Sequence, residues 1–236
     1  MKLLCLETAT SAAAVALVVD GVRIAEEIPS TQRHHTETLM ASVASILDAA
    51  GMSLRSLDGI VVDIGPGLFT GLRVGLATAR SLAATTEVAL YCTTSLEALA
   101  ADPRAHEFDS VLSVVDARRG EVFVQAFGGS VNGVRESIGA PALVTPEILA
   151  AMGTQLVGSA ALVGDGALRY AAMVSGVTVI EDVIVPSPAS AGVLVERDRR
   201  APVDPMVALP LYLRDPDAVA NFTVAAQVAR LTPNGG

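Results

Sequence analysis

Apolar and polar positions along the chain follow two different periods, and these predict most of its elements. Short, mainly apolar runs predict strands at residues 2–8, 12–19, 22–28, 59–64 and 88–92. Apolar residues at helical spacing predict helices at residues 35–50 and 70–84, the first ended by Gly51. Because Asp20-Gly21 is a typical hairpin turn, the first three strands are expected to form an antiparallel meander.

The second half of the chain partly repeats this order. Similar runs predict strands at residues 111–115, 121–127 and 134–138, and helices at residues 146–152 and from a turn at 164–166 to residue 173. Gly128-Gly129 and Asn132-Gly133 predict turns. Residues 215–236 carry little pattern and are interpreted as a C-terminal tail. The mixture of strands and helices indicates an α/β fold.

Composition and charge exclude several classes of protein. The 236 residues are 51% hydrophobic and 17% charged, which excludes a disordered chain. The net charge of −9 and the low aromatic content, 3%, argue against a broad nucleic-acid-binding face. Glu7 interrupts the apolar N-terminus and no long uncharged stretch is purely apolar, so we expect no membrane span and a cytoplasmic location.

The two helices of the first half contain unusually few charges. Residues 38–50 carry only Asp48, and residues 70–86 carry only Arg73 and Arg80. Each helix also has a stripe of small residues at four-residue spacing: Ala41, Ser45 and Ala49 on the first, and Gly71, Gly75, Ala79 and Ala83 on the second. Such stripes let helices pack closely. Two alternatives follow: the stripes pack within their own lobe, or they form a docking face for another chain.

Few residues are spaced for catalysis or metal binding. His34 and His35 are adjacent, whereas a helical metal pair needs i, i+4 spacing, so no metal site is predicted. The polar turn at residues 8–11 lacks the glycine and lysine of a Walker loop. The Gly65-Pro66-Gly67 turn opens a helix, so it either offers N–H groups to an anion or is a structural turn.

Five segments together resemble one family, the bacterial TsaB (YeaZ) proteins. They are E-T-A-T at residues 7–10, R-H-H-T at 33–36, G-P-G-L-F-T-G-L-R at 65–73, D-A-R-R-G-E-V-F at 116–123 and P-L-Y-L-R at 210–214. The third matches G-P-G-S-F-T-G-L-R at all but one position and is the most specific. Within these segments the family-motif polar residues are His35, Thr36, Thr70, Arg73, Asp116, Arg118 and Glu121.

The resemblance implies the actin-like, sugar-kinase-like and Hsp70-like (ASKHA) fold, with two related α/β lobes of mixed sheets flanked by helices. The expected units are residues 1–100, a smaller lobe at 101–214 and the tail at 215–236. The implied role is a non-catalytic dimerisation and activating subunit, without a cofactor of its own. The complex it would serve transfers a threonylcarbamoyl group to N6 of the adenosine beside the tRNA anticodon.

The resemblance also implies partners and site residues. The partners are a TsaD-like catalytic subunit, a TsaE-like ATPase, tRNA through the complex, and a second copy when the chain is alone. The catalytic subunit carries its metal on an H-x-x-x-H helix, whose later position here is Leu39. The expected interface, on the first two helices, comprises Leu39, Ala41, Ser45, Ala49, Leu68, Phe69, Gly71, Leu72, Gly75 and Ala79.

An enzyme is the alternative hypothesis. A nucleotide-binding phosphotransferase or ATPase of the same fold would use residues near the first turn: Glu7, Thr8, Thr10, Gly65 and Gly67. A metallopeptidase is a third option, which the missing histidine pair opposes. Two positions depart from the family motif: Glu7 replaces Asp, and Leu68 replaces a serine that would cap the helix, a role we expect Thr70 to take over.

Overall fold

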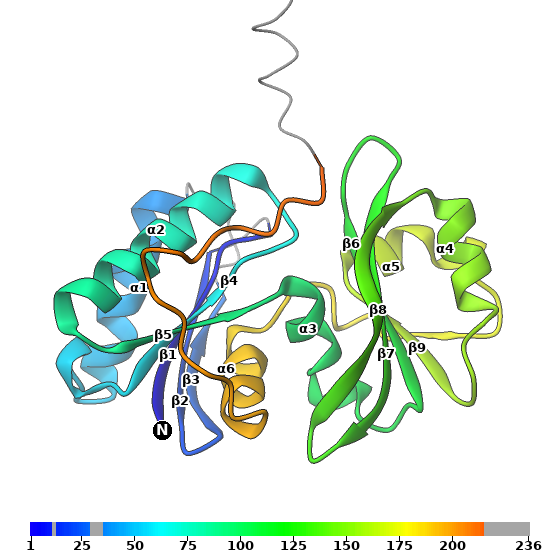
Figure 1. The fold of residues 1–236 in the computed structure, drawn as a ribbon. Helices are drawn as coiled ribbons and strands as arrows, with labels where there is room; N and C mark the ends of the chain where they lie inside the picture. Colours follow the sequence, from blue (N-terminus) through cyan, green and yellow to red (C-terminus); the bar gives the residue numbers. More distant parts are fainter. Residues whose placement is uncertain (11–12, 29–34, 215–236) are drawn as a thin grey trace, which may run out of the picture.

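The computed structural model describes residues 1–10, 13–28 and 35–214 and shows two mixed sheets flanked by helices (Figure 1). The first sheet has the order β3-β2-β1-β4-β5 and the second the order β10-β9-β6-β7-β8. The two orders are equivalent, because each sheet begins with an antiparallel meander and continues with parallel strands. This repeat confirms the α/β class with two related lobes of the actin-like type. The predicted tail, Ser11, Arg33 and His34 lie outside the described residues.

The first sheet is formed by the strands predicted from the early apolar runs. They are β1 (Lys2–Glu7), β2 (Ala14–Val19), β3 (Val22–Glu27), β4 (Gly59–Asp63) and β5 (Ala89–Thr93). Two helices, α1 (His35–Ala49) and α2 (Phe69–Thr86), cover one face of this sheet, with a 3-10 turn at Leu54–Ser56 between α1 and β4. The core beneath them consists mainly of Leu, Ile and Val side chains of both layers.

The second sheet repeats the same element order. Its strands are β6 (Ser110–Asp116), β7 (Val122–Val131), β8 (Val134–Val144), β9 (Ala160–Val163) and β10 (Thr178–Val179). Helices α4 (Pro146–Gly153) and α5 (Asp165–Tyr170) cover one face, and a 3-10 turn follows at Ala171–Met173. The turn predicted at Gly128-Gly129 is wrong. Both glycines lie within β7, which pairs with β8 along its length. The register of that pairing shifts between Phe127 and Ser130, where the two glycines lie.

The third helix of each half packs across the junction between the lobes. Helix α3 (Ser95–Ala100) follows β5 but packs mainly on the second sheet, and the 3-10 turn Pro103–Ala105 then leads to β6. Helix α6 (Pro188–Arg197) follows β10 but packs on the open face of the first sheet, where Gly192 lies against Cys5 and Val18. The two sheets are therefore each covered by a helix from the other half of the chain (Figure 1).

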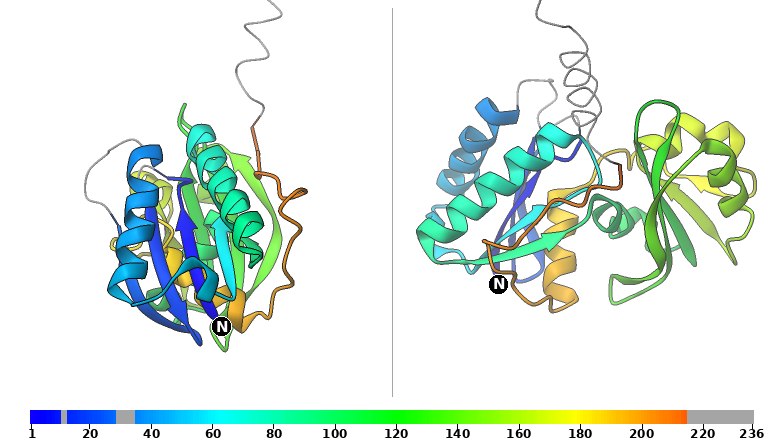
Figure 2. Two further views of the ribbon diagram at one scale, coloured as in Figure 1. Left: turned by 90° about the vertical axis from the view of Figure 1, so that its left-hand side faces the viewer. Right: turned by 45° about the horizontal axis from the view of Figure 1, so that its top comes forward.

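Residues 201–214, called the strap from here on, return along the edge of the first sheet beside α2 (Figure 2). The N–H of Val203 donates to the carbonyl of Leu90 at 2.7 Å, and the N–H of Leu211 donates to that of Ile64 at 2.8 Å. Ala208 is buried in the core under α2. The strap thus covers the outer edge of β5 and lies beside α2, so α2 and the strap form adjacent parts of the same surface.

Candidate functional site

Helix α1 divides into a buried and an exposed side. Leu39, Val43, Ile46 and Leu47 pack in the core. The exposed side carries the predicted small residues and their neighbours: Met40, Ala41, Ala44, Ser45, Asp48 and Ala49. Asp48 is the one charged residue in this set, so the outward face of α1 over residues 38–49 is almost uncharged. Leu39, an expected interface residue, lies on the opposite side of α1 and is buried in the core. Its side chain is a hydrocarbon, so it offers no metal ligand at the position of the second histidine in H-x-x-x-H.

The small-residue stripe of α2 faces inward, toward the loop after β1. A Cβ atom on Gly71 would lie 1.9 Å from the carbonyl oxygen of Thr8, and one on Gly75 would lie 2.1 Å from the Thr8 hydroxyl. That hydroxyl donates a hydrogen bond of 2.8 Å to the Gly71 carbonyl. Ala79 and Ala83 are buried in the core. For α2 the structure therefore shows the first alternative, close packing within the lobe.

This result corrects the placement of several expected interface residues. Gly71, Leu72, Gly75 and Ala79 are buried within their own lobe, so any contact with another chain must be made by exposed neighbours. The expectation that Thr70 caps α2 is also wrong. The N-cap residue is Leu68, whose side chain makes no capping hydrogen bond. The N–H of Leu68 instead donates to the Ala9 carbonyl at 2.7 Å.

Aromatic and cationic side chains meet where α2 joins the strap. The rings of Phe69 and Tyr212 lie 5.0 Å apart, and the Arg73 guanidinium lies over Phe69 at 3.8 Å. Arg73 Nε also donates to the Tyr212 hydroxyl at 3.1 Å. All three side chains are exposed. The sequence placed Phe69 and Arg73 in one motif and Tyr212 in another, but gave no sign that they touch.

The residues proposed for a phosphate site do come together at one end of the first sheet. Glu7 is only 2% exposed, and its own loop satisfies its carboxylate. Oε1 accepts from the N–H and the hydroxyl of Thr10, both at 2.9 Å, and Oε2 accepts from the N–H of Ala9 at 3.2 Å. Gly67 presses on the same loop, since a Cβ there would lie 2.2 Å from the Ala9 carbonyl oxygen. The loop and the turn thus pack directly on each other.

A second buried carboxyl, Asp63, ends β4 beside Glu7 and was not predicted as a site residue. Its Oδ1 accepts from the N–H of Gly65 at 2.7 Å and from the Ser95 hydroxyl at 3.0 Å, while its Oδ2 is buried without a hydrogen-bond partner. Burial, and then the neighbouring Glu7 carboxylate, raise the pKa of Asp63 well above its ordinary value. The only signal in the sequence was a carboxylate at the end of a buried strand.

The hairpin between β6 and β7 occupies the equivalent position in the second lobe and is cross-linked by charge. The Asp116 carboxylate accepts from Arg118 Nη1 at 3.1 Å and from Arg169 Nη1 at 2.8 Å. Glu121 pairs with Arg214, which also donates to the Ala117 carbonyl at 2.7 Å. From its sequence, this charged segment is either a salt-bridged turn or a polar contact site, and the ion pairs support a salt-bridged turn.

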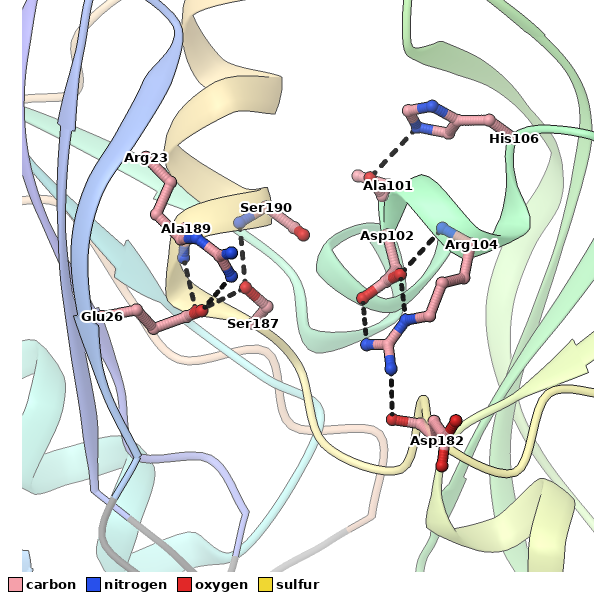
Figure 3. Close-up of polar contacts among 10 residues, drawn as sticks. All are labelled: Arg23, Glu26, Ala101, Asp102, Arg104, His106, Asp182, Ser187, Ala189 and Ser190. Carbon is pink, nitrogen blue, oxygen red and sulfur yellow. Dashed lines mark hydrogen bonds and ion pairs between the residues drawn. The ribbon is translucent and has the colours of Figure 1, made fainter.

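Two further networks tie down the segments that cross between the lobes (Figure 3). Glu26 on β3 accepts from the Ser187 hydroxyl at 2.6 Å and from the N–H of Ala189 at 3.2 Å, so it holds the start of α6. Asp102 accepts from Arg104 Nη2 at 2.8 Å, and Arg104 Nη1 donates to the Asp182 carbonyl at 2.9 Å. The second network joins the segment after α3 to the segment that leads into α6.

Residues 1–10, 13–28 and 35–214 contain neither a metal cluster nor a membrane-spanning helix. No three His, Cys, Asp or Glu side chains there are grouped so that they could hold a metal ion. Across the same residues, no helix combines the length and the apolar character needed to span a membrane.

The structure has two equivalent lobes, and the exchanged helices α3 and α6 each pack on the sheet formed by the other half of the chain. This arrangement defines the class as a two-lobed protein of the actin-like ASKHA fold. Residues 26–176 match the family model described as TsaD: tRNA N6-adenosine threonylcarbamoyltransferase. The chain is 33% identical to the tRNA threonylcarbamoyladenosine biosynthesis protein TsaB of Escherichia coli, over 70% of this chain and 72% of that protein. The Bacillus subtilis TsaB is 34% identical over 58% of this chain and 59% of its own length. The YeaZ structure from Pseudomonas aeruginosa superposes with a TM-score of 0.77 at 26% identity, covering 90% of this chain and 99% of that one. The chain belongs to the TsaB (YeaZ) family.

Proposed function

We propose that this chain serves tRNA threonylcarbamoyladenosine biosynthesis as a non-catalytic subunit that pairs with a TsaD-type transferase and activates it. The names of its TsaB relatives support the biosynthetic role. The match to the transferase family model supports common ancestry with the proposed partner. A subunit that shares the transferase fold without its metal-binding histidine pair is suited to binding rather than chemistry.

The observation that carries the proposal is the outward face of α1. Among residues 38–49 of α1, whose side chains the structure describes, six are exposed; one of these is charged and four are Ala or Ser. A normal surface helix carries a charged outer face. A face depleted in charge is typical of the centre of a protein interface. The exposed side of α2 adds more small residues, at Ala77, Ser81 and Ala84. Helices α1 and α2 lie side by side on one face of the first sheet (Figure 2), so we expect their exposed sides to act together.

The proposal extends to the other components of the complex. A TsaE-like ATPase would join the pair, and tRNA would be bound by the assembled complex because a chain of net charge −9 attracts phosphate poorly. When the partner is absent, the same apolar face would pair two copies of this chain. Such pairing would shield the patch from water until the transferase subunit replaces the second copy.

The phosphotransferase alternative has less support from the geometry. Its central carboxylate, Glu7, accepts three hydrogen bonds from its own loop and is almost completely buried. The adjacent Gly67 turn is packed against that loop. A nucleotide phosphate would have to displace these contacts. Calorimetric titration of the purified chain with ATP tests this alternative directly.

The main test is reconstitution with a matched pair of variants. Ala41→Arg places a charge on the exposed side of α1, whereas Ala151→Arg places one on the exposed side of α4 in the other lobe. We expect the wild type and A151R to bind the transferase subunit and stimulate threonylcarbamoyl transfer to tRNA. We expect A41R to bind at least about 100-fold more weakly, because the buried charge would have no partner. A wild-type chain that neither binds nor stimulates the transferase would refute the proposal.

A further inference from the structure

The line along which α2 and the strap meet is an exposed seam of apolar side chains and two arginines. Met206 and Leu209 are 76% and 71% exposed, and Val207 lies between them at 64%. Phe69 and Tyr212 extend the apolar surface at the other end of the seam. Isolated exposed apolar residues are common, but five on adjoining parts of α2 and the strap are typical of an interaction site.

The strap holds these side chains outward on a fixed backbone. The Asp204 carboxylate accepts from the N–H of Met206 at 2.8 Å, and the Asp204 carbonyl accepts from the N–H groups of Val207 and Ala208 at 3.0 and 3.2 Å. The Ala208 side chain is buried below. Because the turn is closed and anchored, exposure of its neighbours does not result from a loose segment, and little ordering is needed on binding.

The two cations of the seam have no carboxylate partner among residues 1–10, 13–28 and 35–214. Arg73 is held by the Tyr212 hydroxyl and the Phe69 ring, and Arg80 Nη2 donates to the Met206 carbonyl at 3.4 Å. Neither arginine forms an ion pair with any residue in the described ranges. They are also the only charged residues of α2. Two arginines anchored on one side of α2 beside exposed apolar side chains are suited to pair with carboxylates of another chain, whereas an unpaired arginine alone would not be.

The spacing of the two arginines specifies the shape of the partner. Arg73 and Arg80 are seven residues apart on α2, so they lie on one side about 10.5 Å apart along the axis. A second helix with two carboxylates seven residues apart has the same separation. The row of apolar side chains beside the arginines would contact apolar residues on such a helix, in the manner of a helix bound in a groove.

We propose that this seam binds a helix of the transferase-type partner that carries Asp or Glu at i and i+7, flanked by apolar residues. The inference rests on the proposed function for the identity of the partner and adds the strap to the contact surface. A second copy of this chain is disfavoured at the seam, because a symmetric pair would bring guanidinium groups of like charge together.

The test compares charge-reversed full-length chains for binding to the transferase subunit at low and high salt. We expect the double variant Arg73→Glu and Arg80→Glu to bind about 100-fold more weakly and to lose most of the salt dependence seen for the wild type. Arg55→Glu, an exposed arginine at the 3-10 turn Leu54–Ser56 that forms no ion pair with the described residues, is the control and should bind like the wild type. Met206→Ser combined with Leu209→Ser should weaken binding about tenfold without changing the unfolding midpoint.

The outcomes separate this inference from the proposed function. If the wild type binds the transferase and the double charge reversal binds equally well, the seam inference is overturned while the proposed function stands. If charge reversal changes only the self-association of this chain, measured by sedimentation, the occupant is a second copy and the inference is also wrong. A wild type that fails to bind the transferase at all overturns both.

Discussion

Replacement of the buried glycines of α2 by alanine tests whether their small size serves packing within the lobe. The Cβ of Gly71→Ala would lie 1.9 Å from the Thr8 carbonyl oxygen, whereas ordinary contact begins at 3.4 Å, so backbone must move by about 1.5 Å. Overpacking of this kind costs about 3 kcal/mol. Alanine returns about 1 kcal/mol of helix propensity. We therefore expect a net loss of about 2 kcal/mol in the free energy of unfolding.

Gly75→Ala offers a sharper comparison, because its clash is with a side chain. The added Cβ would lie 2.1 Å from the Thr8 hydroxyl oxygen but 3.3 Å from the Thr8 Cβ. Thr8→Ala removes the hydroxyl and leaves the Cβ, so it should rescue Gly75→Ala. It should not rescue Gly71→Ala, whose clash is with the Thr8 backbone. A double-mutant cycle should therefore give a coupling of about 2 kcal/mol for residues 8 and 75, and close to none for residues 8 and 71.

Urea unfolding followed by circular dichroism measures each corner of both cycles at a protein concentration where the chain is a single species. Ala77→Gly, at an exposed position of α2, is the control for helix propensity alone and should cost about 1 kcal/mol. If Gly71→Ala and Gly75→Ala leave the unfolding midpoint unchanged and weaken only association with another chain, the stripe faces outward and our account of α2 is refuted.

Three further predictions concern ionisation and capping. The raised pKa of Asp63 means that the folded state holds an extra proton, so stability should fall as pH rises above about 4, and Asp63→Asn should remove this slope and raise the urea midpoint at pH 8. Burial alone would raise the pKa of Glu97, but its bonds to Arg200 lower it. The Glu97–Arg200 contribution should therefore be lost as pH falls below about 4, and Glu97→Gln should destabilise at pH 7 more than at pH 3, measured by the same unfolding assay. Ser187→Ala removes the cap of α6 and should cost about 1 kcal/mol in thermal or urea unfolding, whereas Thr145→Ala, at the uncapped start of α4, should cost much less.

The sequence predicted the strands of the first sheet because each is a mainly apolar run of five or six residues bounded by polar or turn residues. It predicted α1 and α2 to within a few residues. It missed α3, which has six residues, and β10, which has two, because such short segments show no measurable period. Helix α6 carried a usable signal, Ser187 followed by Pro188 at the first helical position, but the neighbouring prolines obscured it.

The candidate site was predictable only in part, because spacing on a helix does not show which side faces the sheet. On α2 the buried glycines Gly71 and Gly75 lie next to the buried leucines Leu72 and Leu76. One wide arc of the helix therefore faces inward. The neighbours Glu7 and Asp63 follow from the parallel pairing of β1 with β4, which no local pattern reveals. The contact of Tyr212 with Arg73 depends on the path of the strap across 139 residues of sequence.

The exchanged helices have a consequence for synthesis of the chain on the ribosome. The open face of the first sheet, which includes Leu3, Cys5, Ala16 and Val18, is covered by α6, whose residues emerge only after almost two hundred others. Until then the nascent amino-terminal half keeps an uncovered apolar surface, so it is prone to aggregate or to recruit chaperones. A translation product that stops before residue 188 therefore lacks part of its first core, even though all five strands of the first sheet are present.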